Sequence, residues 1–240
     1  MKDLMTWEKI TDILIKEFEN QNYEKDEKMP SENNMAIRFC VARTEIRRAY
    51  EQLKDMGYIY SIQGCGSFFS GKKEKIKLII SDNQSFTEKM KALGVSYETK
   101  NMGCEEMKDH AALGEMGRAV RDFSKQEKVY KLSRLRMIDG EPAAIHISYL
   151  SGRVFPNLSK DGRKITSLFS YMKEWGYDDF QNKDYQLSVI APDQKERKML
   201  QMKGYNSCLV LNAKCIENES GRILEISRTI YRGDRFIFVL

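Results

Sequence analysis

The stretch Met29–Phe69, MPSENNMAIRFCVARTEIRRAYEQLKDMGYIYSIQGCGSFF, determines the expected fold of the N-terminal part of the chain. It predicts a short helix that begins after Ser31, a turn at Cys40–Ala42 and a longer helix that begins at Arg43. Two strand-like runs follow, joined by a Gly-x-Gly turn at residues 64–66. This order of elements is that of a winged helix-turn-helix, which lays one helix in the major groove of DNA.

The second predicted helix carries a cluster of arginines on its outward side. Arg43 and Arg47 lie one turn apart, with Thr44 and Arg48 beside them. Guanidinium groups match both phosphate oxygens and the edge of guanine. Such a cluster could equally be a solvated helix face, but the glycine-tipped wing that follows directly favours DNA binding. The net charge of +5 adds little, because local basicity governs phosphate contacts.

This stretch resembles the DNA-binding domain of GntR-type bacterial transcription regulators. The residues that carry the resemblance are Pro30-Ser31-Glu32, Ala36, Phe39, Val41, Arg43-Thr44, Arg47, Ala49, Leu53, Gly57, Gln63-Gly64, Gly66 and Phe68. The resemblance implies DNA contacts from Ser31, Glu32, Asn33, Arg43, Thr44, Arg47, Arg48, Gln63, Gly64 and Gly66. Two positions depart from the family pattern. Asn33 replaces an arginine, and Ala42 replaces the hydroxyl residue that caps the recognition helix, a loss of about 0.5–2 kcal/mol.

The composition excludes several other classes of protein. At 240 residues the chain is long enough for two modest domains, and no apolar run approaches the roughly 18 residues of a membrane span. No signal peptide follows Met1, and five cysteines without C-x-x-C spacing fit a reducing compartment. We therefore expect a cytoplasmic protein without membrane contact. Cys40 and Cys65 lie in the DNA-binding stretch, where plain thiols are favoured over a redox switch.

The rest of the chain differs from the N-terminal stretch in composition and in the pattern of its apolar residues. Charged residues at 70–75 indicate a linker, so we assign residues 1–70 to the winged helix-turn-helix domain, 71–77 to the linker and 78–240 to a second domain. Alternating residues and turn signals, Asp139-Gly140 among them, predict strands at 97–104, 129–138, 143–149, 207–216 and 223–231 and helices at 86–93, 111–120, 165–175 and 193–202. Helices mixed with hairpin-connected strands predict an α+β domain with a mainly antiparallel sheet.

Two arginines stand out in this second domain. Arg134 and Arg136 lie two residues apart on a predicted strand, so both face the same side together with the apolar Leu132 and Ile138. An unpaired buried charge is very costly, so each arginine needs an anionic partner. The partner is either an internal carboxylate or the phosphate or carboxylate group of a ligand.

The second domain resembles the UTRA ligand-binding domain of the HutC/FarR branch of the GntR regulators. The carriers are Ser85-Phe86-Thr87, the run RLRMIDGEP at residues 134–142, Ser167-Leu168 and the ending YRGDRF at residues 231–236. The resemblance implies a chorismate-lyase-like fold with a six-stranded, mainly antiparallel sheet. It also implies effector contacts from Ser85, Thr87, Arg134, Arg136, His146, Ser167, Glu225 and Tyr231. Three of these have simpler readings: Glu225 as a partner of Arg228, Tyr231 as a core tyrosine and His146 as a core histidine.

Together these features predict a homodimeric transcription regulator, and specifically a repressor, that binds a palindromic double-stranded DNA operator. A small anionic effector, a sugar phosphate by resemblance, would control its affinity for DNA, with a carboxylate effector as the alternative. The sequence shows no catalytic set and no metal-ligand spacing, so we predict no catalytic residue, no metal and no cofactor. An enzyme of chorismate-lyase-like fold and an architectural DNA-binding protein without effector are the competing classes.

Overall fold

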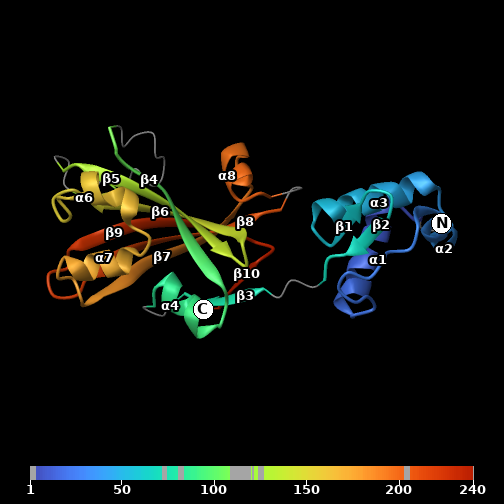
Figure 1. The fold of residues 1–240 in the computed structure, drawn as a ribbon, viewed down its shortest axis with the longest axis horizontal. Helices are drawn as coiled ribbons and strands as arrows, with labels where there is room; N and C mark the ends of the chain where they lie inside the picture. The colour runs from blue at the N-terminus through green and yellow to red at the C-terminus, as the bar shows by residue number, and fades with distance from the viewer. Residues whose placement is uncertain are drawn as a thin grey trace. The chain divides into compact units, whose positions relative to one another are not determined.

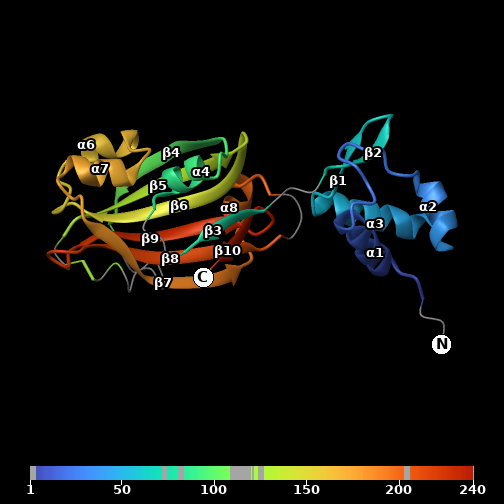
Figure 2. The ribbon, with the colours of Figure 1, turned by 90° about the horizontal axis from the view of Figure 1, so that it is seen from below.

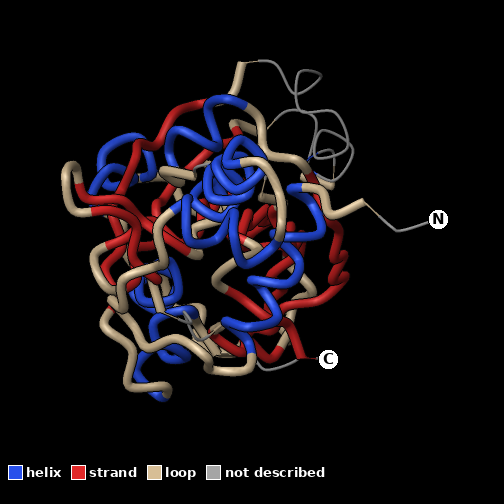
Figure 3. Tube along the Cα trace, turned by 90° about the vertical axis from the view of Figure 1, so that its right-hand side faces the viewer, coloured by secondary structure: helices blue, strands red, loops and turns tan. Residues whose placement is uncertain are grey.

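The computed structural model describes residues 4–71, 75–80, 84–108, 120, 122–123, 127–202 and 206–239. The chain divides into two compact units, whose main division falls between Lys75 and Ile76. Helices and strands occur in both units (Figures 1 and 3). The predicted helix at 111–120 lies outside the described residues except for Val120, and so do residues 72–74 of the predicted linker.

The first unit begins with helix α1 (Trp7–Glu19). The predicted order of elements follows it: helices α2 (Glu32–Phe39) and α3 (Arg43–Asp55), then strands β1 (Ile59–Ile62) and β2 (Gly66–Phe69). Its core joins the apolar stripe of α1, including Ile10 and Leu14, to Ile46 and Leu53 of α3. β1 and β2 pair in antiparallel register. The winged helix-turn-helix prediction is confirmed.

The ends of the helices follow from single residues. The Ser31 hydroxyl accepts a hydrogen bond from the backbone N–H of Asn34 at 3.2 Å and so caps α2. Ala42 has the extended backbone of an N-cap, φ −64° and ψ 144°, but no side-chain hydrogen bond. Gly57 directly follows the C-cap residue of α3. Its φ of +80° is a left-handed conformation that favours glycine.

The second unit is built on a six-stranded sheet in the order β4-β5-β6-β9-β8-β7, with every neighbouring pair antiparallel (Figures 1 and 2). The hairpin between β5 and β6 turns at Asp139 and Gly140, both with positive φ. The strands are β4 (Tyr97–Glu106), β5 (Val129–Ile138), β6 (Glu141–Ser151), β7 (Phe180–Ile190), β8 (Cys208–Glu217) and β9 (Ile223–Arg232). The α+β prediction is confirmed.

A separate parallel pair joins the start of this unit to its end. β3 (Ile76–Ile79) pairs with β10 (Phe236–Val239). Ile76 and Lys77, which the sequence assigned to the linker, form the first half of β3. The first strand after the linker is therefore fixed to the last strand of the chain.

Three helices cover one face of the large sheet: α4 (Phe86–Ala92), α6 (Leu158–Asp161), which is followed by a 3-10 turn at Gly162–Lys164, and α7 (Leu168–Glu174). Leu168 and Met172 of α7 pack over Leu132 of β5. Met90 of α4 packs near Ile138 together with β3 and β10. Between these two apolar clusters the same sheet face carries polar side chains. The described part of this unit also contains helix α8 (Gln194–Met199).

Candidate functional site

The exposed arginines of α3 are organised by a carboxylate at the start of α2. Glu32 Oε2 accepts a hydrogen bond from Arg43 Nε at 2.7 Å and lies 3.5 Å from a terminal nitrogen of Arg47. Burial raises the pKa of Glu32, but the hydrogen bonds from both arginines outweigh it and leave this pKa below its ordinary value. More than half of each arginine side chain is exposed. Glu32 therefore holds two accessible guanidinium groups side by side.

A second carboxylate serves the neighbouring arginine. Glu45 Oε1 lies 3.5 Å from Arg48, while Glu45 Oε2 accepts the backbone N–H of Trp7 at 3.0 Å. The Trp7 N–H is in the first turn of α1, where no intrahelical acceptor exists. Glu45 thus ties the start of α1 to the start of α3, the helix with the arginine cluster.

The wing ends in two glycines that a side chain would disturb. Gly64 and Gly66 have φ of +77° and +114°, and a Cβ at Gly66 would lie 3.3 Å from Lys28 Cε. Both conformations are easiest for glycine. Gln63 lies at the exposed tip with them, while Asn33 is exposed in the first turn of α2. The predicted DNA contacts therefore gather at the starts of α2 and α3 and at the wing.

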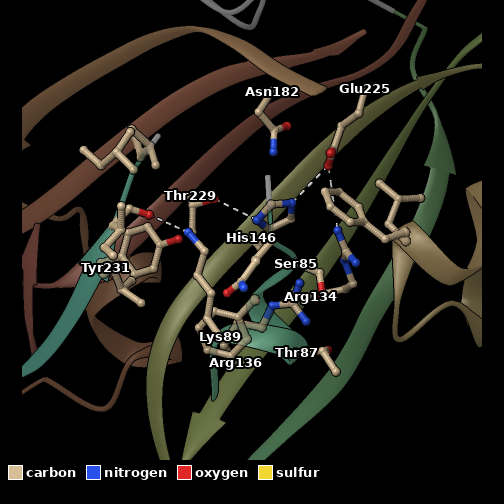
Figure 4. Close-up of a pocket in the computed structure, with 18 of the residues that line it drawn as sticks. Ser85, Thr87, Lys89, Arg134, Arg136, His146, Asn182, Glu225, Thr229 and Tyr231 are labelled. Carbon is tan, nitrogen blue, oxygen red and sulfur yellow. Dashed lines mark hydrogen bonds and ion pairs between the residues drawn. The ribbon is translucent and has the colours of Figure 1, made fainter. Parts of the chain in front are cut away.

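A pocket of about 110 Å³ opens over the polar part of the large sheet (Figure 4). Every residue that the sequence assigned to an effector lines it: Ser85, Thr87, Arg134, Arg136, His146, Ser167, Glu225 and Tyr231. The strand register explains this convergence, because Arg134 faces His146 across β5 and β6, and His146 faces Thr229 across β6 and β9. Side chains in register on neighbouring strands share one face.

The two arginines of the pocket differ in their partners. Arg134, 1% exposed, donates to Ser148 Oγ at 2.8 Å and lies 3.8 Å from Glu225. Arg136, 6% exposed, donates to Thr99 Oγ1 at 2.6 Å. Its guanidinium also lies 4.9 Å from the centre of the Phe86 ring. Within the described part of the chain no carboxylate reaches ion-pair distance of Arg136.

Burial makes both charges costly. It lowers the pKa of Arg134 to about 10 and, together with the neighbouring charge of Arg134, the pKa of Arg136 to about 9. The Nε atoms of both side chains are buried without a hydrogen-bond partner among the described residues. An internal carboxylate therefore compensates Arg134 in part and leaves Arg136 uncompensated.

Glu225 is the carboxylate of this site, and its partners lie across the sheet. Its Oε1 accepts from His146 Nε2 at 3.0 Å and from the Ser148 hydroxyl. Burial raises the pKa of Glu225, but the His146 hydrogen bond, Arg134 and Ser148 outweigh it and leave this pKa lowered. The reading of Glu225 as a partner of Arg228 is wrong, because residues three apart on a strand face opposite sides.

His146 is neutral with its proton on Nε2. A carboxylate only accepts, so Nε2 must donate to Glu225, and Nδ1 accepts from the Thr229 hydroxyl at 2.7 Å. Burial and the charge of Arg134 lower the pKa of His146 to about 4. His146 is thus a satisfied histidine, as the simpler reading held, and also a wall of the pocket.

Ser85 and Ser167 have a structural task besides facing the pocket. The Ser85 hydroxyl caps α4 by accepting the Glu88 N–H, and the Glu88 carboxylate accepts the Ser85 N–H in return. The Ser167 hydroxyl accepts from the backbone and hydroxyl of Ser170 at the start of α7. In both cases the serine oxygen accepts, so its own O–H proton can point into the pocket. Burial raises the pKa of Tyr231 to about 12, which keeps its phenol a donor.

Sequence reasoning missed five polar residues of the pocket: Gln84, Lys89, Asn182, Tyr185 and Thr229. Lys89 stands four residues after Ser85, a spacing that places it on the same side of α4. Thr229 precedes Tyr231 by two residues and shares its strand face. Asn182 lies on β7, a strand that the sequence did not predict.

The described residues show neither a metal-binding cluster nor a membrane-spanning helix. No group of three or more His, Cys, Asp or Glu side chains there could hold a metal ion. No helix in the described ranges is long and apolar enough to cross a membrane.

Comparisons with known proteins agree with both units. The family model for the UTRA domain matches residues 93–237, and that for bacterial regulatory proteins of the gntR family matches residues 6–69. The HTH-type transcriptional repressor NagR of Bacillus subtilis strain 168 is 24% identical over 231 residues, 96% of this chain and 91% of NagR. The histidine utilization repressor of Pseudomonas putida is 21% identical over 228 residues, 95% of this chain and 88% of that protein.

A solved structure shows the same fold. The crystal structure of PhnF from Mycobacterium smegmatis matches with a TM-score of 0.61 at 21% identity, over 96% of this chain and 97% of PhnF. These relatives are transcription regulators and not enzymes, which argues against the enzyme of chorismate-lyase-like fold that the sequence left as an alternative. Because the UTRA model alone spans more than half of the sequence, this chain belongs to the gntR family of bacterial regulatory proteins and carries a C-terminal UTRA domain.

Proposed function

We propose that this protein is a repressor whose affinity for its DNA operator is controlled by a sugar phosphate bound in the pocket. The observation that carries the proposal is Arg136, a buried guanidinium without a carboxylate partner among the described residues, beside the partly compensated Arg134. Such a pair is stabilised when an anion enters. Planar guanidinium groups suit the oxygens of a phosphate dianion.

The hydroxyl groups of Ser85, Thr87 and Ser167 line the same pocket as the arginines. A hydroxyl that already accepts a hydrogen bond can still donate its own proton to a phosphate oxygen. We therefore assign the phosphate to the end of the pocket that holds the arginines and these hydroxyls.

Glu225, beside Arg134, and Tyr231 suit the neutral, hydroxyl-bearing body of the same ligand. The described contacts of Glu225 all fall on Oε1, so Oε2 can accept from a ligand hydroxyl, and Tyr231 can donate to one. The Arg134 guanidinium, 3.8 Å away, already balances the charge of Glu225, which leaves little charge to attract an ammonium group. A ligand with free hydroxyls therefore fits better than an amino derivative.

A carboxylate effector is the second candidate. The neutral imidazole of His146 lines the pocket and takes no charge away from a carboxylate ligand, and a histidine utilization repressor is among the relatives. Charge separates the two classes, since two arginines balance a dianion better than a monoanion.

For DNA, we assign Arg43, Thr44 and Arg47 to the major groove and the wing around Gly64 to the adjacent minor groove. We propose a homodimer, because a two-fold protein places two recognition helices on matched half-sites of a palindrome. The exposed apolar side chains of Leu187 and Val189 on β7, an edge strand of the sheet, support a subunit contact.

Calorimetry with a matched ligand pair tests the effector assignment. Glucose 6-phosphate should bind the full-length protein more tightly than glucose, and the operator affinity should change only with the phosphate. Equal binding of sugar and phosphate would remove the anion site. Acetate or glucuronate in place of glucose 6-phosphate tests the carboxylate alternative.

A further inference from the structure

The pocket contains a third cation, Lys89, on α4. It lines the same cavity as Arg134 and Arg136, and Figure 4 shows its ammonium on the Tyr231 side of that cavity. Its ammonium donates a hydrogen bond to the backbone carbonyl of Ile79, with Nζ and O 2.6 Å apart. Lys89 therefore connects the pocket to strand β3.

β3 is held at both ends of its parallel pairing with β10. The Ile76 N–H donates to the Arg235 carbonyl at 2.8 Å, and the Ile80 N–H donates to the Val239 carbonyl at 3.1 Å. Leu78 is buried, while Ile79 is 50% exposed. The residue that accepts from Lys89 is thus the last residue of β3, and it lies between the buried Leu78 and Ile80.

The charges of the pocket set up a competition for the Lys89 ammonium. The described lining holds Lys89, Arg134 and Arg136 against one carboxylate, Glu225, which accepts from His146 and Ser148. An anion attracts the ammonium through its full charge as well as through a hydrogen bond, whereas the Ile79 carbonyl offers only a dipole. The lysine stem is flexible and its ammonium has three donors, so it can turn from the carbonyl to a ligand.

We propose that Lys89 is the residue that passes effector binding to β3: an anion in the pocket draws its ammonium away from the Ile79 carbonyl and loosens the end of the strand. This rests on the proposed function only in that the effector is anionic. β3 is the first element after the segment that leads from the DNA-binding unit. Ile79 is at the end of β3 away from that segment, so a loosened Ile79 carbonyl acts on the segment through the backbone pairing of β3 with β10.

The first test needs no ligand. Lys89→Met removes the ammonium and keeps the length of the side chain, and Lys91→Met is the matched control, because Lys91 is exposed on the same helix and does not line the pocket. In the full-length protein, Lys89→Met should speed hydrogen exchange of residues 76–80 about fivefold or more. DNA that binds the parent protein can be selected in vitro. The affinity of Lys89→Met for this DNA should shift towards the affinity of the effector-bound parent. Unchanged exchange and unchanged DNA affinity, as expected for Lys91→Met, would overturn the proposal.

The second test uses inorganic phosphate and glucose 6-phosphate as probes. Lys89→Met should bind them about tenfold more weakly than the parent, and a saturating probe should change its DNA affinity less. If Lys89→Met binds the probe more weakly but a saturating probe changes its DNA affinity as much as it does in the parent, Lys89 contacts the anion without coupling it to DNA. That result would overturn the proposal. If no anion binds the parent, the proposed effector class fails, while the exchange experiment still decides the role of Lys89.

Discussion

The two arginine pairs of this protein differ in what surrounds them. Arg43 and Arg47 on α3 are more than half exposed and share Glu32, so water and a carboxylate compensate both charges. Arg134 and Arg136 on β5 are almost fully buried, and only Arg134 approaches a carboxylate in the described structure. Two exposed guanidinium groups stay hydrated until DNA binds, at little cost in free energy. Two buried guanidinium groups cost free energy until an anion binds them.

The largest expected effect is therefore in the pocket. Arg136→Ala should weaken glucose 6-phosphate binding by about 2–5 kcal/mol, because the variant loses a desolvated partner of the anion. Calorimetry measures this directly. Arg163→Ala, an exposed arginine of the same unit, is the control and should bind as the parent does. If the two variants bind equally well, the buried pair does not hold the effector.

The exposed pair should give a smaller loss. Arg43→Ala or Arg47→Ala should weaken specific DNA binding by about 1–3 kcal/mol for each lost base contact. Mobility-shift titrations at fixed salt compare them with Lys54→Ala, an exposed residue at the far end of α3. Should the arginine variants bind as tightly as this control, the recognition-helix assignment is wrong.

The buried network around His146 predicts a dependence of stability on pH. His146 stays neutral in the folded protein down to about pH 4, whereas an unfolded histidine takes up its proton near pH 6.5. Between these values the unfolded chain binds more protons, so stability should rise with pH across this window and level off above it.

Urea unfolding at pH 5 and pH 7 measures this effect, which we expect to be about 1–2 kcal/mol for the parent. His146→Gln should reduce the difference, since glutamine does not titrate. The lowered pKa of Glu225 acts below this window, where its stabilising charge is lost as the pH falls. An equal pH dependence in parent and variant would show that His146 is not the titrating group.

The sequence predicted the elements whose signals are local. The Asp139-Gly140 turn fixed the β5–β6 hairpin, and the spacing of Arg43 and Arg47 fixed α3. β7 escaped prediction because this edge strand, FQNKDYQLSVI, has little buried surface and so no clear alternation of apolar residues. β10 escaped because four residues are too few to show a period.

The partners of the site residues were harder to predict, because they come from pairing across the sheet. Arg228 is three residues from Glu225 and was the obvious partner in the sequence, yet it lies on the opposite face. His146, the actual partner, is 79 residues away and is brought there by the β6–β9 pairing. Face and register decide such contacts, and only face can be read from one strand.

The smallest expected effect concerns the stability of the exposed arginine helix. Ala42 occupies the N-cap of α3 with the right backbone conformation but no oxygen to offer, so Ala42→Ser should stabilise the first unit by about 1 kcal/mol. Urea unfolding followed by fluorescence measures the gain in a Trp175→Phe background, where Trp7 of the first unit is the one tryptophan left. Ala191→Ser adds the same hydroxyl at an exposed position outside any helix and should change nothing. A gain in the first variant alone would show that the arginine helix lacks only a cap, since no charge is altered. Equal stability of both variants would mean that the Glu45 carboxylate, which already joins α1 to α3, supplies all the fixation that the start of this helix needs.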